Sequence, residues 1–157
     1  MNTKQINDIL KKNIFTRKIF QGVYARDQLK KIHVPKNKRS AFVVHTEPLR
    51  IKIGHWICVI FEPDGSAIFI DSFGIDLTGF HPDIQHFVKK NSNQVFQNKR
   101  LLQDVTSSTC GLYVLYFIYQ KSKGKSLKEM LKPFHSFNTK KNDRWIIRHI
   151  QKIVIKQ

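Results

Sequence analysis

The longest apolar run in the chain extends from Leu112 to Tyr119 and follows a polar stretch, Thr106 to Thr109. Serine and threonine ahead of an apolar segment are typical of a helix start. A helix that lacks a polar face belongs in the interior of a domain. The pattern therefore predicts a central, buried helix that carries Cys110 in its first turn.

A β-hairpin is predicted where two shorter apolar runs, 55–61 and 66–71, flank the sequence Glu62-Pro-Asp-Gly65. Proline at the second position and glycine at the last are strong turn signals. The first run is apolar on both faces after its first residue, which is typical of a strand inside a sheet. We therefore expect this hairpin in the middle of the sheet.

The register of this hairpin decides whether His55 and Asp71 meet. In a three-residue loop with Gly65 left-handed, Asp71 lies opposite Ile57, diagonal to His55 and on the same face. A two-residue loop would place the two side chains on opposite faces. The sequence thus permits a hydrogen bond between them without requiring it. The alternative is that Asp71 only caps the turn that follows it.

Flanking helices and strands are predicted from the rest of the pattern. Helices are expected at 3–12, 82–90, 126–132 and 142–155, strands at 40–45 and 94–103, a turn with a short segment at 19–29, and a basic loop at 30–39. Asn142 or Asp143 should cap the last helix, with Trp145, Ile146, Ile150, Ile153 and Val154 facing inward. The order of helix, strands and helix, without a long linker, predicts a single α+β domain over residues 1–157.

Positive charge dominates the composition, with 28 Lys and Arg against 11 Asp and Glu, and a net charge of +17. Such a chain attracts polyanions, and non-specific DNA is the expected partner. The alternative is that the lysines only keep the chain soluble. Nucleic acid binding by this chain should depend on salt and not on sequence.

Other classes of protein fit the sequence poorly. The first residues lack the apolar core of a secretion signal, and no run approaches the roughly 20 apolar residues that a membrane span needs. We therefore expect a protein that is neither secreted nor bound to a membrane. We also expect it to be a monomer. Two cysteines, Cys58 and Cys110, are too few for a disulfide framework or a zinc site without histidines at a suitable spacing, so no metal is expected.

The predicted position of Cys110 favours chemistry, because the positive end of a helix stabilises a thiolate. The alternative is that Cys110 is a small apolar residue of the core. Acyl transfer by cysteine needs a base, a group that orients the base, and donors for the developing oxyanion. His55, Asp71 and Gln103 are the candidates for these parts, and the backbone N–H of Cys110 is a second oxyanion donor.

Taken together, these residues resemble a known family in order and spacing. His55-Trp56, then a strand-ending Asp71, then Gln103 and, after six residues, Cys110-Gly111, are similar to the adenovirus-type (adenain-like) cysteine proteases. That family shares a clan with the proteases that act on ubiquitin-like proteins. The sequences 71–74 (DSFG) and 20–24 (FQGVY) resemble the adenain-like proteases of small double-stranded-DNA viruses and Polinton-type elements. The resemblance covers roughly residues 20–150.

The resemblance implies a role for each matching residue. His55 corresponds to the general base, Asp71 to the third triad member, Gln103 to the oxyanion-hole amide and Cys110 to the nucleophile. The adenovirus enzymes tend to use glutamate where this chain has Asp71. Trp56 corresponds to the residue that walls a narrow cleft for small residues, usually glycine, and its alternative is a core aromatic.

The resemblance further implies an α+β fold with the cysteine on a central helix packed against a mixed or antiparallel sheet. The adenovirus enzymes use DNA as a cofactor, which agrees with the charge of +17, and they need a viral peptide that is disulfide-bonded to the protease. Cys58 lies within an apolar strand and is expected to be buried, so nothing supports a disulfide-linked peptide here. The chemistry itself requires no cofactor, and DNA is the expected activator.

Three functions are consistent with these observations. The first is a cysteine endopeptidase that processes viral capsid or core precursors at Gly-containing sites during virion maturation, in the virion or in the host nucleus or cytoplasm. The second is a deconjugating or processing protease for ubiquitin-like proteins. The third is a non-catalytic, basic DNA-binding structural protein in which Cys110 belongs to the core.

Overall fold

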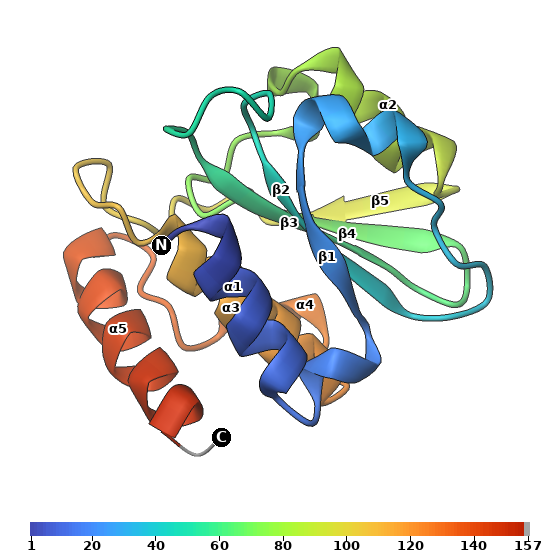
Figure 1. Cartoon of the computed structure of the whole chain (residues 1–157). Coiled ribbons are helices and arrows are strands. Elements are labelled where there is room, and N and C mark those ends of the chain that lie inside the picture. The colour runs from blue at the N-terminus through green and yellow to red at the C-terminus, as the bar shows by residue number, and fades with distance from the viewer. Residues whose placement is uncertain (156–157) are drawn as a thin grey trace.

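Over residues 1–155, which this computed structural model describes, the chain forms an α+β structure with a mixed five-stranded sheet and helices on both of its faces (Figure 1). The strands are β1 (Phe20–Ala25), β2 (Ser40–His45), β3 (Trp56–Phe61), β4 (Ser66–Ile70) and β5 (Gln94–Gln97). The α-helices are α1 (Thr3–Lys12), α2 (Pro82–Lys90), α3 (Cys110–Ser122), α4 (Leu127–Leu131) and α5 (Thr139–Ile155), and short 3-10 turns lie at Thr16–Lys18, Arg26–Lys31 and Leu77–Gly79. The predicted fold class is confirmed.

The strands lie in the sheet in chain order, from β1 to β5. The pairs β2–β3 and β3–β4 are antiparallel, whereas the edge strands β1 and β5 run parallel to their neighbours. Strand β3 is therefore central, as expected for a run that is apolar on both faces. The start of this strand places Trp56, and His55 before it, at one end of the sheet.

Alternate residues of β3 face two separate apolar cores. Cys58 and Ile60 pack in the core that contains α1, α3 and α5, whereas Ile57 and Val59 pack in the core that contains α2. Figure 1 shows α1, α3, α4 and α5 on one side of the sheet and α2 on the other. This two-sided burial explains the continuous apolar pattern of the strand.

The hairpin has the three-residue loop that brings His55 and Asp71 to one face. Cys58 pairs with Ile70, and the backbone N–H of Glu62 donates to the carbonyl of Ser66 (2.9 Å). Gly65 has φ of 86°, the left-handed conformation that a bulged loop of this type requires. By this register, the residue that follows β4 lies opposite the first residues of β3.

Helix α3 is held at both ends. Near its C-terminal end, Lys121 forms an ion pair with Glu62 (2.6 Å), which also pairs with Arg39 (2.8 Å). At the N-terminal end, the hydroxyl of Thr109 donates to Asp143 (3.0 Å) and does not cap the helix. The polar residues before α3 were expected to start it by capping, whereas in the structure Thr109 attaches the helix to α5.

Strand β1 differs from the prediction, which gave residues 19–29 a turn and a short segment. Gly22 suggested a turn, but it forms a bulge within the strand, with φ of 150°. This φ favours glycine, and a Cβ here would also lie 2.8 Å from the hydroxyl of Tyr24. The turn that was expected comes later, as a 3-10 turn at Arg26–Lys31.

Two further boundaries differ from the prediction. Strand β5 ends at Gln97 and not at Gln103, because the following residues leave the sheet to pack near Asp71. Helix α5 begins at Thr139, where the side chain of Asn138 accepts from the N–H of Lys141 (2.9 Å).

Asn142 and Asp143 therefore do not cap α5: both are buried within the helix, where their side chains bind neighbouring segments. Val154, expected to face inward, is 38% exposed. None of the helices in the described part of the chain has both the length and the apolar character needed to cross a membrane.

Candidate active site

His55 and Asp71 form a hydrogen bond between Nε2 and a carboxylate oxygen, as the hairpin register permitted. Asp71 is only 1% exposed, and its second oxygen accepts from the N–H of Ile75 (2.9 Å). Both sequence interpretations of Asp71 therefore hold, because one oxygen binds the imidazole and the other holds the turn. A buried carboxylate with two donors is fixed in place and can orient the histidine.

Two further contacts fix the position of His55, one to its ring and one to its backbone. Its ring stacks on Phe73 with 4.7 Å between ring centroids and 27° between the planes. The backbone N–H of His55 donates to the hydroxyl of Thr46 (3.1 Å). These contacts leave the ring little freedom to turn away from the start of α3.

Cys110 is the first residue of α3 and lies within hydrogen-bonding reach of His55. Burial acts to raise the pKa of the Cys110 thiol, but hydrogen bonds from His55 and from the backbone of Trp56 and Gly111 outweigh it and lower the pKa. Burial acts to lower the pKa of His55, but hydrogen bonds with Asp71 and Cys110 raise it to about 9. The two shifts favour a thiolate facing an imidazolium, the reactive state of a thiol nucleophile.

Gln103 is buried, and its side-chain amide is held in a fixed orientation. Its side-chain oxygen accepts from the hydroxyl of Ser72 (2.6 Å), and its side-chain nitrogen donates to the carbonyl of Ser107 (2.9 Å). An amide nitrogen has two hydrogens, so one N–H remains for a further acceptor. The N–H of Cys110 also remains, because the first N–H groups of a helix have no partner within it.

Trp56 has contacts that fit both of its sequence interpretations. It is 7% exposed and belongs to the core on the α3 side of the sheet. Its ring lies 4.6 Å from that of His45, and its indole N–H donates to the carbonyl of Met1 (3.2 Å). The same side chain forms part of the wall of a cavity.

Ser72 and Asn98 support the site and were not identified from the sequence. Ser72 fixes the amide of Gln103 through its hydroxyl, and its carbonyl accepts from the N–H of Gln103 (3.0 Å). Asn98 binds both backbone groups of Asp71, accepting from the N–H (3.1 Å) and donating to the carbonyl (2.7 Å). The signal in the sequence was weak: Ser72 follows a strand-ending acid, and Asn98 was counted within a predicted strand.

Asp143 was expected at a helix start and is instead a buried acceptor beneath the loop that leads to Cys110. It accepts from the hydroxyls of Thr109 (3.0 Å) and Tyr113 (2.9 Å) and from the N–H of Asp104 (3.2 Å). This carboxylate therefore sets the position of the segment just before the thiol.

Cys58 lies at the centre of β3, fully buried and without a disulfide. Burial raises the pKa of its thiol, and the charge of Asp71 raises it further. Its side chain is not accessible to a partner peptide in this fold. Within residues 1–155, no group of three or more metal-ligating side chains is gathered in one place.

Comparison with known proteins gives similarity in fold. No protein-family model matches the sequence, and no curated protein sequence matches it significantly. ChlaDub1 from Chlamydia trachomatis is similar in structure, with a TM-score of 0.51 and 15% identity over 73% of this chain. The central domain of the uncharacterized Lpg1148 protein from Legionella pneumophila is similar over 100% of this chain, with a TM-score of 0.55 and 12% identity.

The lengths of these matches differ. This chain spans 58% of the ChlaDub1 structure but 98% of the Lpg1148 domain. The arrangement of sheet and helices is therefore one that solved structures share, over a unit of the size seen in the Lpg1148 domain.

Proposed function

We propose that the chain is a cysteine peptidase that cleaves amide bonds through a thioester intermediate. The observation that carries this proposal is the pairing of His55 with both Asp71 and Cys110, with a raised pKa on the imidazole and a lowered pKa on the thiol. A buried core cysteine would have the opposite shift, as Cys58 has. The similar fold of ChlaDub1 agrees with the proposal.

In the first half of the reaction, the Cys110 thiolate attacks the carbonyl carbon of the substrate. The negative charge moves to the carbonyl oxygen, where the Gln103 side-chain amide and the Cys110 backbone N–H donate to it. The imidazolium of His55 then gives its proton to the departing amine, and the C–N bond breaks. The products of this half are a free amine and a thioester on Cys110.

In the second half, His55 is neutral and takes a proton from a water molecule as it attacks the thioester carbonyl. The C–S bond breaks, the acid product leaves, and the thiolate–imidazolium pair is restored. Asp71 holds the imidazole in the required orientation in both halves and stabilises its charged form.

We propose that its substrates are viral precursor polypeptides, which it cuts at Gly-containing sites as a virion maturation endopeptidase. The resemblance of the His55-Trp56 and Gln103…Cys110-Gly111 patterns to adenain-like proteases supports it, as does the net charge of +17. A protease for ubiquitin-like proteins uses the same chemistry and is the second candidate. The fold similarity to ChlaDub1 supports this second candidate as well as the first.

Association with DNA is a further part of this proposal, and α5 carries the observation that favours it. Helix α5 lies on the outside of the fold (Figure 1), and its residues Lys141, Arg144, Arg148 and Lys152 are exposed. In the part of the chain that the structure describes, none of the ion pairs involves α5. An unneutralised basic helix face suits a phosphate backbone. Glutamate at Arg144 and Arg148 should weaken binding to duplex DNA and flatten its salt dependence, and unchanged binding would exclude this face.

The proposal is tested by alkylation of the purified protein with iodoacetamide across pH, located by mass spectrometry. We expect Cys110 to react quickly near neutral pH and Cys58 to remain unlabelled until the protein unfolds. His55→Ala should slow the reaction of Cys110 at neutral pH, because the thiol pKa returns toward its usual value. If Cys110 is labelled only on unfolding, it is a core residue and the peptidase proposal fails.

A further inference from the structure

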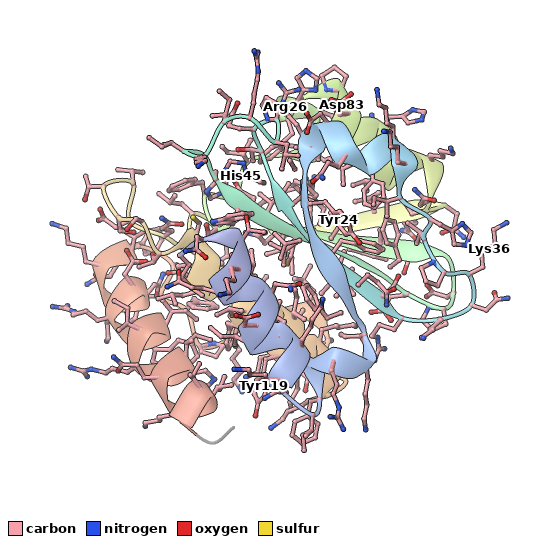
Figure 2. All side chains as sticks on the ribbon, viewed as in Figure 1. Tyr24, Arg26, Lys36, His45, Asp83 and Tyr119 are labelled. Atoms are coloured by element: carbon pink, nitrogen blue, oxygen red, sulfur yellow. The ribbon has the colours of Figure 1, made fainter. Side chains whose placement is uncertain are left out.

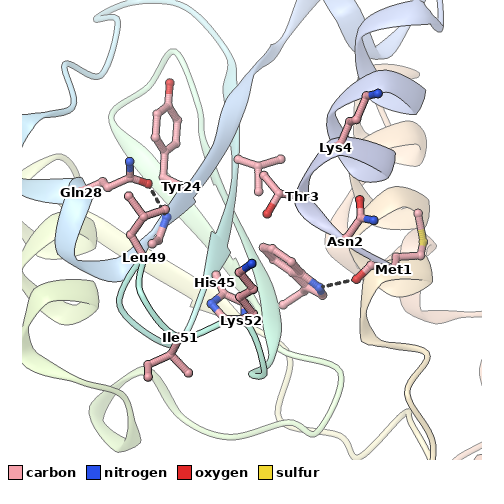
Figure 3. A pocket seen from close by; sticks show the side chains of 13 residues that line it. Met1, Asn2, Thr3, Lys4, Tyr24, Gln28, His45, Leu49, Ile51 and Lys52 are labelled. Atoms are coloured by element: carbon pink, nitrogen blue, oxygen red, sulfur yellow. Dashed lines mark hydrogen bonds between the residues drawn. The ribbon is translucent and has the colours of Figure 1, made fainter.

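A cavity of about 480 Å³ lies beside Trp56, between the start of α1, strand β1 and the loop that joins β2 to β3 (Figure 3). Its walls include Tyr24, His45, Leu49 and Ile51. It is large enough to receive several side chains of a peptide. The proposed catalytic steps use none of the residues that line this cavity.

One end of the cavity lies close to the proposed nucleophile. Met1 forms part of its wall and also lies against Gly111, the residue after Cys110, where an added Cβ would come within 3.0 Å of the Met1 side chain. The carbonyl of Met1 accepts from the indole of Trp56 (3.2 Å), so these two residues of the cavity wall are in contact. Met1 and Trp56 thus lie both in the cavity wall and next to Cys110, whose sulfur accepts from the backbone of Trp56, so this end of the cavity adjoins the thiol.

The loop that borders the cavity exposes apolar side chains. In its sequence, residues 49–53 (LRIKI), apolar and basic residues alternate, and Leu49, Ile51 and Ile53 are 65%, 42% and 89% exposed. Large aliphatic side chains gathered on a surface mark an interaction site more often than isolated ones do. The loop also leads directly into His55, so its apolar face adjoins the proposed active site.

Two lysines on different walls of the cavity give it a positive charge. Lys4 extends from α1 and Lys52 from the loop, and the residues of the described chain that form the walls include neither Asp nor Glu (Figure 3). The loop itself carries one acid, Glu47, whose side chain lies beside Gly54 together with that of His45 but does not line the cavity. Asp27, outside the loop, accepts from the N–H of Leu49 (3.0 Å). An acidic side chain of a bound peptide would complement both lysines.

We propose that this cavity binds the part of the substrate polypeptide next to the scissile bond, and that it selects a segment in which apolar and acidic residues occur together. This inference rests on the proposed peptidase function and adds the chemical class of its substrate. Leu49 and Ile51 contact the apolar side chains, and Lys4 and Lys52 contact the carboxylates. A segment with lysine or arginine at those places is disfavoured by like charge.

Peptide binding to the Cys110→Ala protein tests the proposal without turnover. The probes are dansyl-labelled Glu-Leu-Glu-Leu-Gly-Gly, the same peptide with Lys in place of Glu, and a third with Asn in place of Leu. We expect the acidic, apolar peptide to bind at least about tenfold more tightly than the other two at low salt, and the charge preference to shrink as salt screens it.

Added substitutions locate the site on the protein. In a protein that also carries Lys4→Ala and Lys52→Ala, the preference for Glu over Lys should fall to about twofold or less. Ile51→Ser should weaken the Leu peptide more than the Asn peptide. Lys36→Ala is the matched control, because Lys36 is an exposed lysine at the far edge of the molecule from His45 (Figure 2), and it should leave both preferences in place.

Equal binding of the acidic and basic peptides would overturn the proposal. So would a charge preference that survives the loss of Lys4 and Lys52, because the peptide would then bind elsewhere on this basic protein. Cleavage by the wild-type protein is measured separately. If wild type cleaves none of the peptides while the alanine variant still binds them selectively through these residues, the peptidase function fails and the binding site remains.

Discussion

Cys58 and Cys110 are 0% and 9% exposed, yet the pKa of the Cys58 thiol is raised and that of Cys110 is lowered. Cys58 lies mid-strand, with apolar neighbours on its face of the sheet and the charge of Asp71 nearby. Cys110 lies at a helix start, where His55 and backbone N–H groups point at its sulfur. Burial alone therefore does not decide whether a thiol is reactive, because the donors around the sulfur can outweigh it.

The largest expected effect separates the two cysteines by function. Cys110→Ala should lower peptide cleavage by a factor of about 10⁴ or more, since the nucleophile is lost. Cys58→Ala should leave cleavage within about twofold of wild type, because no step uses that sulfur. Both are measured as kcat/KM on the same fluorogenic peptide. Substantial cleavage by the Cys110→Ala protein would show that Cys110, like Cys58, is structural.

Asp71→Asn should lower kcat by about 10³ to 10⁴, because the amide cannot hold the imidazole in the required tautomer. The pH profile gives a second measurement. The raised pKa of His55 keeps the imidazolium, which protonates the leaving amine, up to about pH 9, so wild-type turnover should fall only above that pH. In the Asp71→Asn protein, turnover should begin to fall at a lower pH. If it falls at the same pH as in the wild type, the role of Asp71 is purely structural.

Gln103→Ala should lower kcat by about 10² to 10³ with little change in KM, because one oxyanion donor is lost. Alkylation of Cys110 by iodoacetamide forms no oxyanion, so its rate reports on the thiolate alone. A loss of cleavage without a loss of alkylation would assign Gln103 to the oxyanion. A parallel loss of both would show that Gln103 only holds the fold around Cys110.

Ser72→Ala should lower kcat by about tenfold, because the Gln103 amide loses the hydroxyl that fixes its orientation. The matched experiment adds the same substitution to the Gln103→Ala protein. In that background, Ser72→Ala should lower kcat little further, since the amide that Ser72 positions is already absent. Independent, multiplying losses in the two backgrounds would mean that Ser72 acts by another route.

The smallest expected effect is a change in the stability of the protein when serine replaces Cys58. Cys58→Ser places a hydroxyl in a fully apolar site and should lower the free energy of unfolding by about 1–3 kcal/mol. Urea denaturation followed by tryptophan fluorescence measures this change. The same change at Cys110 should cost less, because hydrogen-bond donors are already present there. A larger loss of stability at position 110 would reverse the distinction between the two sites.

The sequence predicted the parts of the structure that local rules control. The turn residues around Gly65 predicted the hairpin and limited it to two registers, one of which brings His55 to Asp71, and the apolar run after Cys110 predicted the central helix. It did not predict strand β1, because Gly22 is a common turn signal and its use as a bulge depends on the neighbouring strand. The environments of Ser72 and Asn98 depend on contacts between distant segments, for which single-sequence patterns carry little information.

The attachment of α3 at both ends has a consequence for motion. The Glu62–Lys121 ion pair holds one end of the helix and the Thr109–Asp143 hydrogen bond holds the other. A slide of the helix along its axis would stretch both attachments together, whereas a local opening of its first turn would break only one. Amide hydrogen exchange along α3 should therefore be slow and governed by global unfolding, and fluctuations that change the Cys110–His55 separation should come from the His55 loop.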